Sequence, residues 1–339
     1  MNIIKVQRES NMELCRIIAI SLVVMVHSQF ATFGIPQEFN YISILHIILQ
    51  SVSIIGVNVF VLISGYYSIK LKKSSIINLL YICIFYGIIN LFSQLYLGTF
   101  NIKSLFIISR SNWFIPYYLG LMLVSPILNT WIENTNKNSF RKILIALLIF
   151  ECWFGFFPDV VQIPMFNSGC TITSFMILYL LARYYRLYGI PLFNKFNIGG
   201  YVFSTIIIAL TSIFSLYLGF SSHGVNKPFD SDNPLVIFSA LCFMIYFTKK
   251  KINYSPIINR LAKSTLAVLL IHASGVGHNF LKSIYLEIIK FNIPIYILLL
   301  FLTIFVIYMT CTILDEIRIK SFNYLYQKLE KYGISNTTL

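Results

Sequence analysis

Long runs of apolar residues, separated by short polar breaks, recur along the whole chain. Each run approaches the roughly 20 residues that an α-helix needs to cross about 30 Å of hydrocarbon. The runs also lack the alternating pattern of membrane β-barrel strands. The sequence therefore predicts an all-α, polytopic integral membrane protein with about ten transmembrane helices. Their expected ranges are 14–34, 42–67, 76–97, 113–131, 142–158, 165–187, 201–220, 234–248, 263–280 and 294–315.

The composition agrees with this class, because 57% of the 339 residues are hydrophobic and 11% are charged, whereas soluble domains have about 25% charged residues. The net charge of +14 would favour a nucleic-acid partner in a soluble protein. Here, however, the basic residues concentrate in alternate loops. One side holds Lys5, Arg8, Arg16, Lys70, Lys72, Lys73, Lys137, Arg141, Lys142, Arg183, Arg186, Lys195, Lys249, Lys250, Lys251, Arg260, Lys263, Arg318, Lys320, Lys328 and Lys331. The other side holds Lys103, Arg110, Lys227, Lys282 and Lys290.

This asymmetry predicts an orientation, because positive residues stay in cytoplasmic loops. We expect both termini in the cytoplasm, a location in the inner or plasma membrane, and no nucleic-acid partner. A single transmembrane domain is expected over residues 1–339, with a short basic cytoplasmic tail at about 316–339. The first apolar run lacks the small-residue cleavage pattern of a secretion signal, so we expect it to be retained. The six cysteines show no Cys-x-x-Cys spacing, which indicates neither a disulfide framework nor a zinc site.

Two residues that can carry charge interrupt the first predicted helix. Arg16 lies near its start and His27 lies well inside it, with mostly apolar residues between them. Eleven helical steps make three turns plus about 20° and a rise of about 16 Å, so both side chains share one face. Polar groups at this depth normally face a protein interior or a watery cavity. We therefore predict a cavity that runs from the cytoplasm along this face.

The residue types indicate the chemistry of such a cavity. Histidine is the side chain best suited to accept a proton near neutral pH, and arginine suits an anionic ligand. Glu13, one turn before Arg16, is placed to orient it. The alternative is structural, with Arg16 at the lipid headgroups and His27 in an interhelical hydrogen bond.

The pattern Glu13-x2-Arg16-x10-His27 resembles the first helix of the acyltransferase family 3 integral membrane proteins, many of which O-acetylate bacterial surface polysaccharides. The run GVNVFVLISGYYSI, residues 56–69, is similar to a second family motif that ends in Ser-Gly-Tyr. The matching positions and the basic residues that follow them are Ser64, Gly65, Tyr66, Lys70, Lys72 and Lys73. The family often has arginine in this stretch. Small-residue helix packing and ordinary cytoplasmic charge are the alternative interpretation.

Two later stretches also resemble the family. SRSNWFIPYYLGLMLVSPILN, residues 109–129, matches its Trp-Phe segment, where Trp113 and Arg110 are candidates to contact an acceptor or lipid headgroups. STLAVLLIHASG, residues 264–275, matches its late helix with a central histidine, here His272. Counted from the cytoplasmic start of that helix, His272 lies deep enough to neighbour His27. The other histidines, His46, His223 and His278, are interpreted as structural or solvated.

The resemblance implies a membrane O-acetyltransferase that moves an acetyl group from cytoplasmic acetyl-CoA, its co-substrate, to a hydroxyl of an extracytoplasmic sugar or surface polysaccharide. It assigns catalysis to His27, Arg16 and Glu13, with His27 as general base. Cofactor binding falls to Arg16, Ser64, Gly65, Tyr66, Lys70, Lys72 and Lys73, and acceptor binding to Trp113, Arg110 and His272. The expected partners are a glycan or glycolipid acceptor and membrane lipids, without a metal. Direct transfer and a transient acyl group on His27, Ser28 or Ser64 both stay open.

Two other functions fit the same residues. A transporter or flippase of a glycan or lipid would line its path with Arg16, His27 and His272, although the sequence shows no inverted repeat of the kind found in many transporters. A non-catalytic partner of a synthase would leave His27 without a chemical role. The acceptor, the acyl chain length and the oligomeric state are not specified by the sequence. We expect acceptor selectivity in the polar outer loop at residues 220–233.

Overall fold

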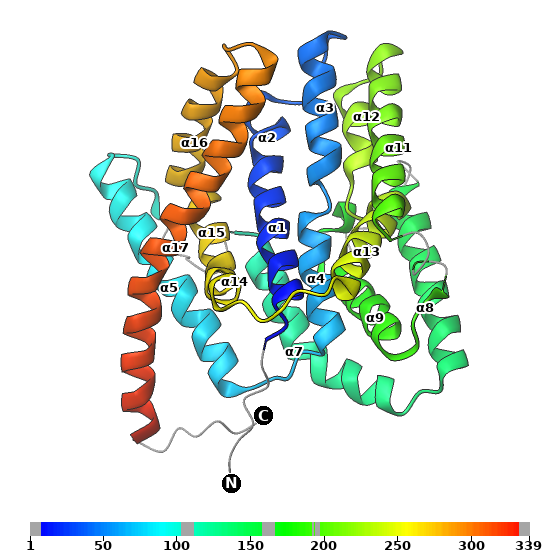
Figure 1. Cartoon of the computed structure of the whole chain (residues 1–339), viewed down its shortest axis with the longest axis vertical. Coiled ribbons are helices and arrows are strands. Elements are labelled where there is room, and N and C mark those ends of the chain that lie inside the picture. The colour runs from blue at the N-terminus through cyan, green and yellow to red at the C-terminus, as the bar shows by residue number, and fades with distance from the viewer. Residues whose placement is uncertain (1–7, 103–111, 158–166, 192, 194–196, 332–339) are drawn as a thin grey trace.

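The computed structural model describes residues 8–102, 112–157, 167–191, 193 and 197–331. Within these residues the regular elements are helices, and most of them run along the long axis of one bundle (Figure 1). Helix α1 (Ser10–His27) lies in the centre. It is flanked on one side by α3 (Tyr41–Ser53) and α4 (Gly56–Tyr67), and on the other by α15 (Thr265–His272) and α17 (Ile293–Lys331) (Figure 1). The helix with the arginine and the histidine is therefore the axis of the fold.

The other helices surround this centre. They are α2 (Phe30–Phe33), α5 (Lys73–Tyr96), α7 (Phe114–Glu133), α8 (Lys137–Glu151), α9 (Ile172–Tyr188), α11 (Asn197–Tyr217), α12 (Ser222–Asn226), α13 (Pro234–Lys249), α14 (Pro256–Leu261) and α16 (Gly275–Ile288). A π-helical turn, Cys152–Phe156, continues α8. Short 3₁₀ turns lie at Asn167–Gly169, Lys227–Phe229 and Ala262–Ser264.

Seven helical segments of the described chain are long and apolar enough to cross a membrane. They are Ser10–Phe33, Tyr41–Tyr67, Lys73–Tyr96, Phe114–Glu133, Asn197–Tyr217, Ser222–Lys249 and Ile293–Lys328. The ranges expected at 142–158, 165–187 and 263–280 coincide with shorter helices. Helix α8 passes into the π-turn, α9 has 17 residues, and the last range is divided between α15 and α16. The membrane-protein class is confirmed, but these three ranges are not among the segments that are both long and apolar enough to cross.

The outer faces of the bundle are apolar. Phe203 and Phe214 on α11 are 63% and 60% exposed, and Leu298 and Phe305 on α17 are 68% and 58% exposed. Large apolar side chains in contact with water would be unfavourable, whereas hydrocarbon accommodates them. These faces therefore suit contact with lipid.

Helix α1 ends at His27 rather than near residue 34 as the apolar run suggested. The chain leaves the helical conformation at Gln29, and a side chain caps the last carbonyl of the helix. Ser28 Oγ donates to Met25 O at 2.7 Å, and Thr32 Oγ1 donates to His27 O at 2.7 Å. Such capping satisfies carbonyls that a helix end leaves without intrahelical partners. The candidate base thus lies at a helix terminus inside the bundle.

Two glycines let α4 approach its neighbours closely. A Cβ at Gly56 would lie 2.8 Å from Ala19 O of α1, and one at Gly65 would lie 2.8 Å from Tyr179 Cα of α9. The first contact lies next to the break between α3 and α4 at residues 54–55. Close packing through small residues is typical of membrane helices. Helix α4 is consequently fixed against both α1 and α9.

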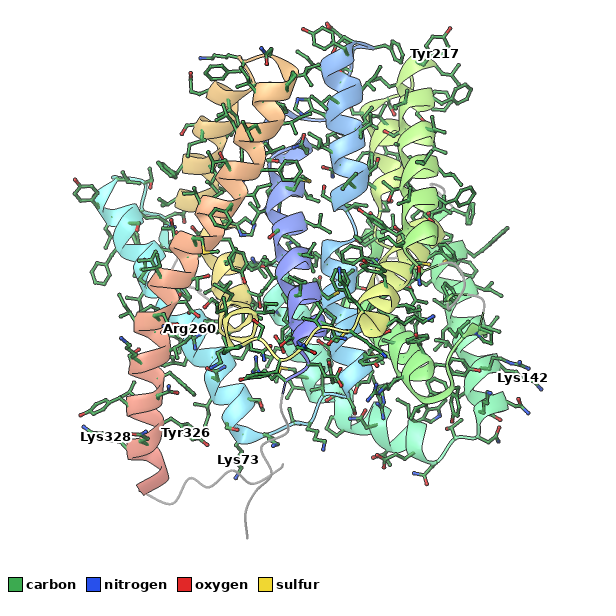
Figure 2. All side chains as sticks on the ribbon, in the orientation of Figure 1. Lys73, Lys142, Tyr217, Arg260, Tyr326 and Lys328 are labelled. Carbon is green, nitrogen blue, oxygen red and sulfur yellow. The ribbon has the colours of Figure 1, made fainter. Side chains whose placement is uncertain are left out.

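The C-terminal helix is longer than the sequence suggested. Helix α17 continues through the expected tail as far as Lys331. Figure 2 shows Lys73 and Lys328 near one end of the bundle and Tyr217 near the other. Helix α1 begins near the end where Lys73 and Lys328 lie (Figures 1 and 2). Along α1, Arg16 therefore lies nearer this basic end of the bundle and His27 nearer the opposite end.

Candidate active site

A cavity of about 840 Å³ lies along α1. Its wall is built from α1, α4, α5, α7, the segment around α15, α16 and α17, so it is assembled from segments far apart in the sequence. The lining residues with polar side chains are Arg8, Arg16, His27, Ser64, Asn78, Asn112, Trp113, Tyr118, Lys263, Thr265, His278, Arg318 and Asn323. A volume of this size is within the usual range for small-molecule sites.

The face of α1 that lines the cavity has the predicted helical spacing. Arg16, Ile20, Val23 and His27 all contribute to the wall, at successive steps of three or four residues. The shared face of Arg16 and His27, and the cavity along it, are therefore confirmed. The middle of this face is apolar because Ile20 and Val23 separate the two polar ends.

Arg16 is oriented by Glu13, as its position one turn earlier suggested. Arg16 Nη1 lies 2.9 Å from Glu13 Oε1 and 2.8 Å from Oε2. Arg8 Nη1 lies 3.7 Å from the same carboxylate. The side chain of Glu13 is 8% exposed, whereas that of Arg16 is 26% exposed and lines the cavity. The carboxylate thus holds two cations at the basic end of the cavity.

His27 and His272 form a hydrogen-bonded pair at the other end. His27 Nδ1 lies 3.0 Å from His272 Nε2, which confirms that the two residues are neighbours. His272 Nδ1 lies 2.6 Å from Val268 O. Because a carbonyl only accepts hydrogen bonds, this Nδ1 carries the hydrogen. In a neutral ring the His272 Nε2 is then an acceptor.

This chain of bonds fixes the tautomer of His27. Its Nδ1 must donate to His272, so the neutral His27 ring has its lone pair on Nε2. His27 lines the cavity, and its Nε2 has no hydrogen-bond partner in the described part of the chain. His272 itself is 1% exposed and does not line the cavity. The arrangement provides a proton acceptor at the cavity wall with a buried residue behind it that orients the ring.

The C-terminal ends of α1 and α15 meet at this pair, since His27 and His272 are the last residues of their helices. A helix C-terminus carries partial negative charge that favours a nearby cation. A positive charge that develops on His27 during proton uptake is therefore stabilised by the backbone.

His278 is a third histidine at this end, and the sequence had suggested only a structural or solvated role. Its ring is 6.2 Å from the His27 ring, between centroids, in an edge-on arrangement, and it lines the cavity. It follows a helix break at residues 273–274, where Ser274 Oγ accepts from Gly277 N at 3.0 Å. Ser274 and the glycines at 275 and 277 are the sequence signal for this break, which the expected range 263–280 passed over. His46, in contrast, is buried and hydrogen-bonded to Gln29 at 2.7 Å.

The second motif, residues 56–69, contributes Val57, Phe60 and Ser64 to the cavity wall. Ser64 lines the wall, and its Oγ lies 3.1 Å from Tyr118 OH on α7. Gly65 instead faces α9. Tyr66 is hydrogen-bonded to Arg186, whose guanidinium lies 4.5 Å from the Tyr66 ring centre. The basic residues after the motif, Lys70, Lys72 and Lys73, are not part of the cavity wall.

The candidates for acceptor binding and selectivity lie at different places relative to the cavity. Trp113 lines the cavity next to α7, 43% exposed. Arg110 lies outside the described residues. The outer loop at 220–233 does not line the cavity, and Phe229 packs on Phe30 at 5.3 Å between ring centres.

Three cations of the cavity wall, Arg8, Lys263 and Arg318, were not predicted as site residues. Arg318 was assigned only to the general cytoplasmic charge, but it is 5% exposed and lines the cavity. The available signal was Asp315, three residues earlier at the end of the last apolar run. Among the described residues, no three His, Cys, Asp or Glu side chains gather where they could hold a metal ion.

Comparison with known proteins gives one match. A family model described as an acyltransferase domain matches residues 9–312. No curated protein and no solved structure matches the chain. The matched range contains all of the cavity's histidines and ends six residues before Arg318.

Proposed function

Since the chain belongs to acyltransferase family 3 and is a membrane acyltransferase, we propose that it moves an acetyl group from cytoplasmic acetyl-CoA to a hydroxyl of an extracytoplasmic sugar or surface polysaccharide. The observation that carries this proposal is the cavity along α1, which joins a basic end to a histidine end. A donor with phosphates on one side of a membrane and an acceptor on the other requires such a path.

The proposed orientation places both termini in the cytoplasm of the inner or plasma membrane. It is supported by Lys73 and Lys328, which lie near one end of the bundle in Figure 2, because basic residues stay on the cytoplasmic side. In this orientation Arg16 is near the cytoplasm and His27 is nearer the outer surface. Ten crossings follow if α8, α9 and the α15–α16 pair also pass through the bilayer.

His27 is the general base of the proposed reaction. Its Nε2 takes the proton of the acceptor hydroxyl while that oxygen attacks the thioester carbonyl carbon. The tetrahedral intermediate then collapses, the carbon–sulfur bond breaks, and His27 returns its proton to the departing thiolate. The products are an acetyl ester and CoA thiol, so no further reactant is needed. General-base assistance of this kind contributes about 10²–10⁴-fold to the rate.

The other cavity residues position the two substrates. Arg16, held by Glu13, faces the phosphates of the donor. Trp113 and His278 line the part of the cavity that we assign to the acceptor sugar, since aromatic rings pack against the apolar faces of sugars. His272 orients His27 and does not contact the substrates. Direct transfer requires no further nucleophile, although Ser64 also lines the wall.

The test compares cell-surface glycans by NMR in cells that produce wild-type protein, His27→Ala or His223→Ala, and in cells that lack the gene. His223 is exposed and outside the cavity, so it is the matched control at equal membrane levels. We expect acetyl resonances with the wild type and His223→Ala only, and the assigned resonance identifies the acceptor. Acetylation by His27→Ala at the wild-type level would contradict the catalytic role. Gene-dependent movement of a glycan across vesicles without acetylation would favour a carrier.

A further inference from the structure

The charged residues of the cavity wall have one sign. Within the described chain they are Arg8, Arg16, Lys263 and Arg318, and we call this set the cationic mouth. The acidic partners, Glu13 and Asp315, do not line the wall. Three of the four cations, Arg8, Arg16 and Arg318, therefore have a carboxylate behind them, and all four present positive charge to the cavity.

Arg318 differs from the other three because it is buried and held on several sides. Its Nε lies 2.8 Å from Asp315 Oδ1, and its Nη2 lies 2.8 Å from Asp315 Oδ2. Its Nη1 lies 3.3 Å from Asn78 Oδ1 on α5. Tyr86 OH, also on α5, donates to Asp315 Oδ1 at 2.7 Å. The side chains of Arg318 and Asp315 are 5% and 0% exposed.

This arrangement is expensive if it serves only the fold. Withdrawing two charges from water costs several kcal/mol per ion, and apolar residues of similar volume are often as stable. An ion pair near the end of a membrane helix can also reach water or headgroups at low cost. Arg318 instead turns inward against α5 and borders the cavity. A buried, fixed guanidinium is suited to bind an anion with little loss of side-chain entropy.

The guanidinium retains donors for such an anion. It has five N–H groups, and the contacts with Asp315 and Asn78 use three of them. The two that are left belong to Nη1 and Nη2 and have no partner in the described chain. Two adjacent N–H groups match two oxygens of one phosphate, which is the bidentate geometry that arginine provides and lysine does not.

We propose that Arg318 is a phosphate-binding residue of the donor site, and that Asp315 is its positioning residue. This inference rests on the proposed function and extends it, because it assigns the binding of the donor's phosphates to residues of both α1 and α17. Arg8 and Arg16 come from α1 and the residues just before it, whereas Lys263 comes from the turn at 262–264 and Arg318 from α17. The lysines after the Ser-Gly-Tyr motif have no part in this site.

The experiment measures CoA binding to the purified full chain in nanodiscs of neutral phosphatidylcholine by isothermal titration calorimetry. The variants are Arg318→Lys and Asp315→Asn, with Arg260→Lys as the matched control. Arg260 on α14 forms an ion pair at 2.8 Å with Glu316, which lies on α17 as Arg318 does, but Arg260 is exposed and does not line the cavity. We expect the dissociation constant for CoA to rise at least tenfold in Arg318→Lys, and to change less than twofold in Arg260→Lys.

A second readout separates a phosphate contact from a general effect on folding. Acetyl-pantetheine has the thioester but lacks the nucleotide phosphates. Arg318→Lys should raise KM for acetyl-CoA and leave kcat/KM for acetyl-pantetheine within twofold of the wild type. An equal loss with both donors would overturn the inference, because the role of Arg318 would then be structural.

Two further outcomes also overturn it. One is CoA affinity that Arg318→Lys leaves unchanged. The other is a result in which phosphatidylglycerol nanodiscs raise the melting temperature of the wild type but not of Arg318→Lys, while both proteins bind CoA equally. Arg318 would then bind a lipid headgroup and not the donor. Failure of the proposed function gives a different result, since CoA then binds through Arg318 but no acetyl group is transferred by the wild type. His27→Ala should bind CoA normally and transfer nothing.

Discussion

The hydrogen bond between His27 and His272 makes a quantitative prediction. In His272→Leu the acceptor for His27 Nδ1 is lost, and the His27 ring can carry its hydrogen on either nitrogen. The position is 1% exposed, so water does not replace the lost partner. A buried polar group without a partner costs about 1–3 kcal/mol. At 1.36 kcal/mol for each factor of ten, kcat should fall about 5- to 150-fold.

This loss should be smaller than that of the base itself, for which about 10²–10⁴-fold is expected. KM for acetyl-CoA should change little because His272 does not line the cavity. His272→Gln is the conservative variant, since its side-chain oxygen can accept from His27 Nδ1 and its amide can donate to Val268 O. We expect it to recover most of the lost kcat.

The assay follows release of CoA thiol by the protein in nanodiscs, with saturating acetyl-CoA and the acceptor that the glycan NMR experiment identifies. Size-exclusion profiles and thermal midpoints establish that the variants are folded. Wild-type kcat in His272→Leu would refute the reasoning. So would a glutamine variant as slow as the leucine variant, because the bond to His27 would then have no part in orienting the base.

Three further predictions concern packing, donor binding and orientation. Gly65→Ala should lower the free energy of unfolding by about 1–3 kcal/mol, the usual cost of overpacking, because its Cβ would meet the backbone of Tyr179. Gly199→Ala is the control and should leave stability unchanged, because the space around Gly199 is open. Equal melting temperatures for the two variants would contradict the close contact at Gly65. The combined Lys70→Ala, Lys72→Ala and Lys73→Ala variant should change KM for acetyl-CoA less than threefold, since these side chains lie outside the cavity wall; a tenfold rise in a kinetic titration would show that they bind the donor. In intact cells, a membrane-impermeant maleimide should label Tyr217→Cys but not Lys328→Cys, and the reverse pattern would invert the proposed orientation.

The first helix shows how much of the site is predictable from the sequence. The positions of Arg16 and His27 on one face follow from helical periodicity alone, and the structure places both on the cavity wall. Glu13 was also found by its spacing, and its bonds to Arg16 agree. The relative positions of side chains on one helix depend only on their spacing in the sequence, so they can be predicted from it.

Features that depend on distant segments were not predictable. Arg318 and Asp315 have the spacing of an ordinary surface pair, and only the approach of Tyr86 and Asn78 on α5 makes them a buried network. The break at residues 54–55 lies in apolar sequence, where the packing of neighbouring helices overrides propensity. The break at 273–274 had a local signal in Ser274 and the glycines that follow it. The continuation of α17 to Lys331 was missed because the expected range ended with the apolar run, whereas a helix can extend beyond the membrane.

The apolar side chains in the middle of the cavity bear on the membrane potential of the cell. A continuous watery path between cytoplasm and exterior would conduct ions and dissipate the membrane potential. Between the cationic mouth and His27 the α1 face of the wall is apolar at Ile20 and Val23, and Phe60 and Leu269 also line the cavity. Narrow apolar constrictions resist wetting, and exclusion of water also protects a reactive thioester from hydrolysis. In the proposed reaction these side chains let the slender donor arm pass and restrict the passage of ions.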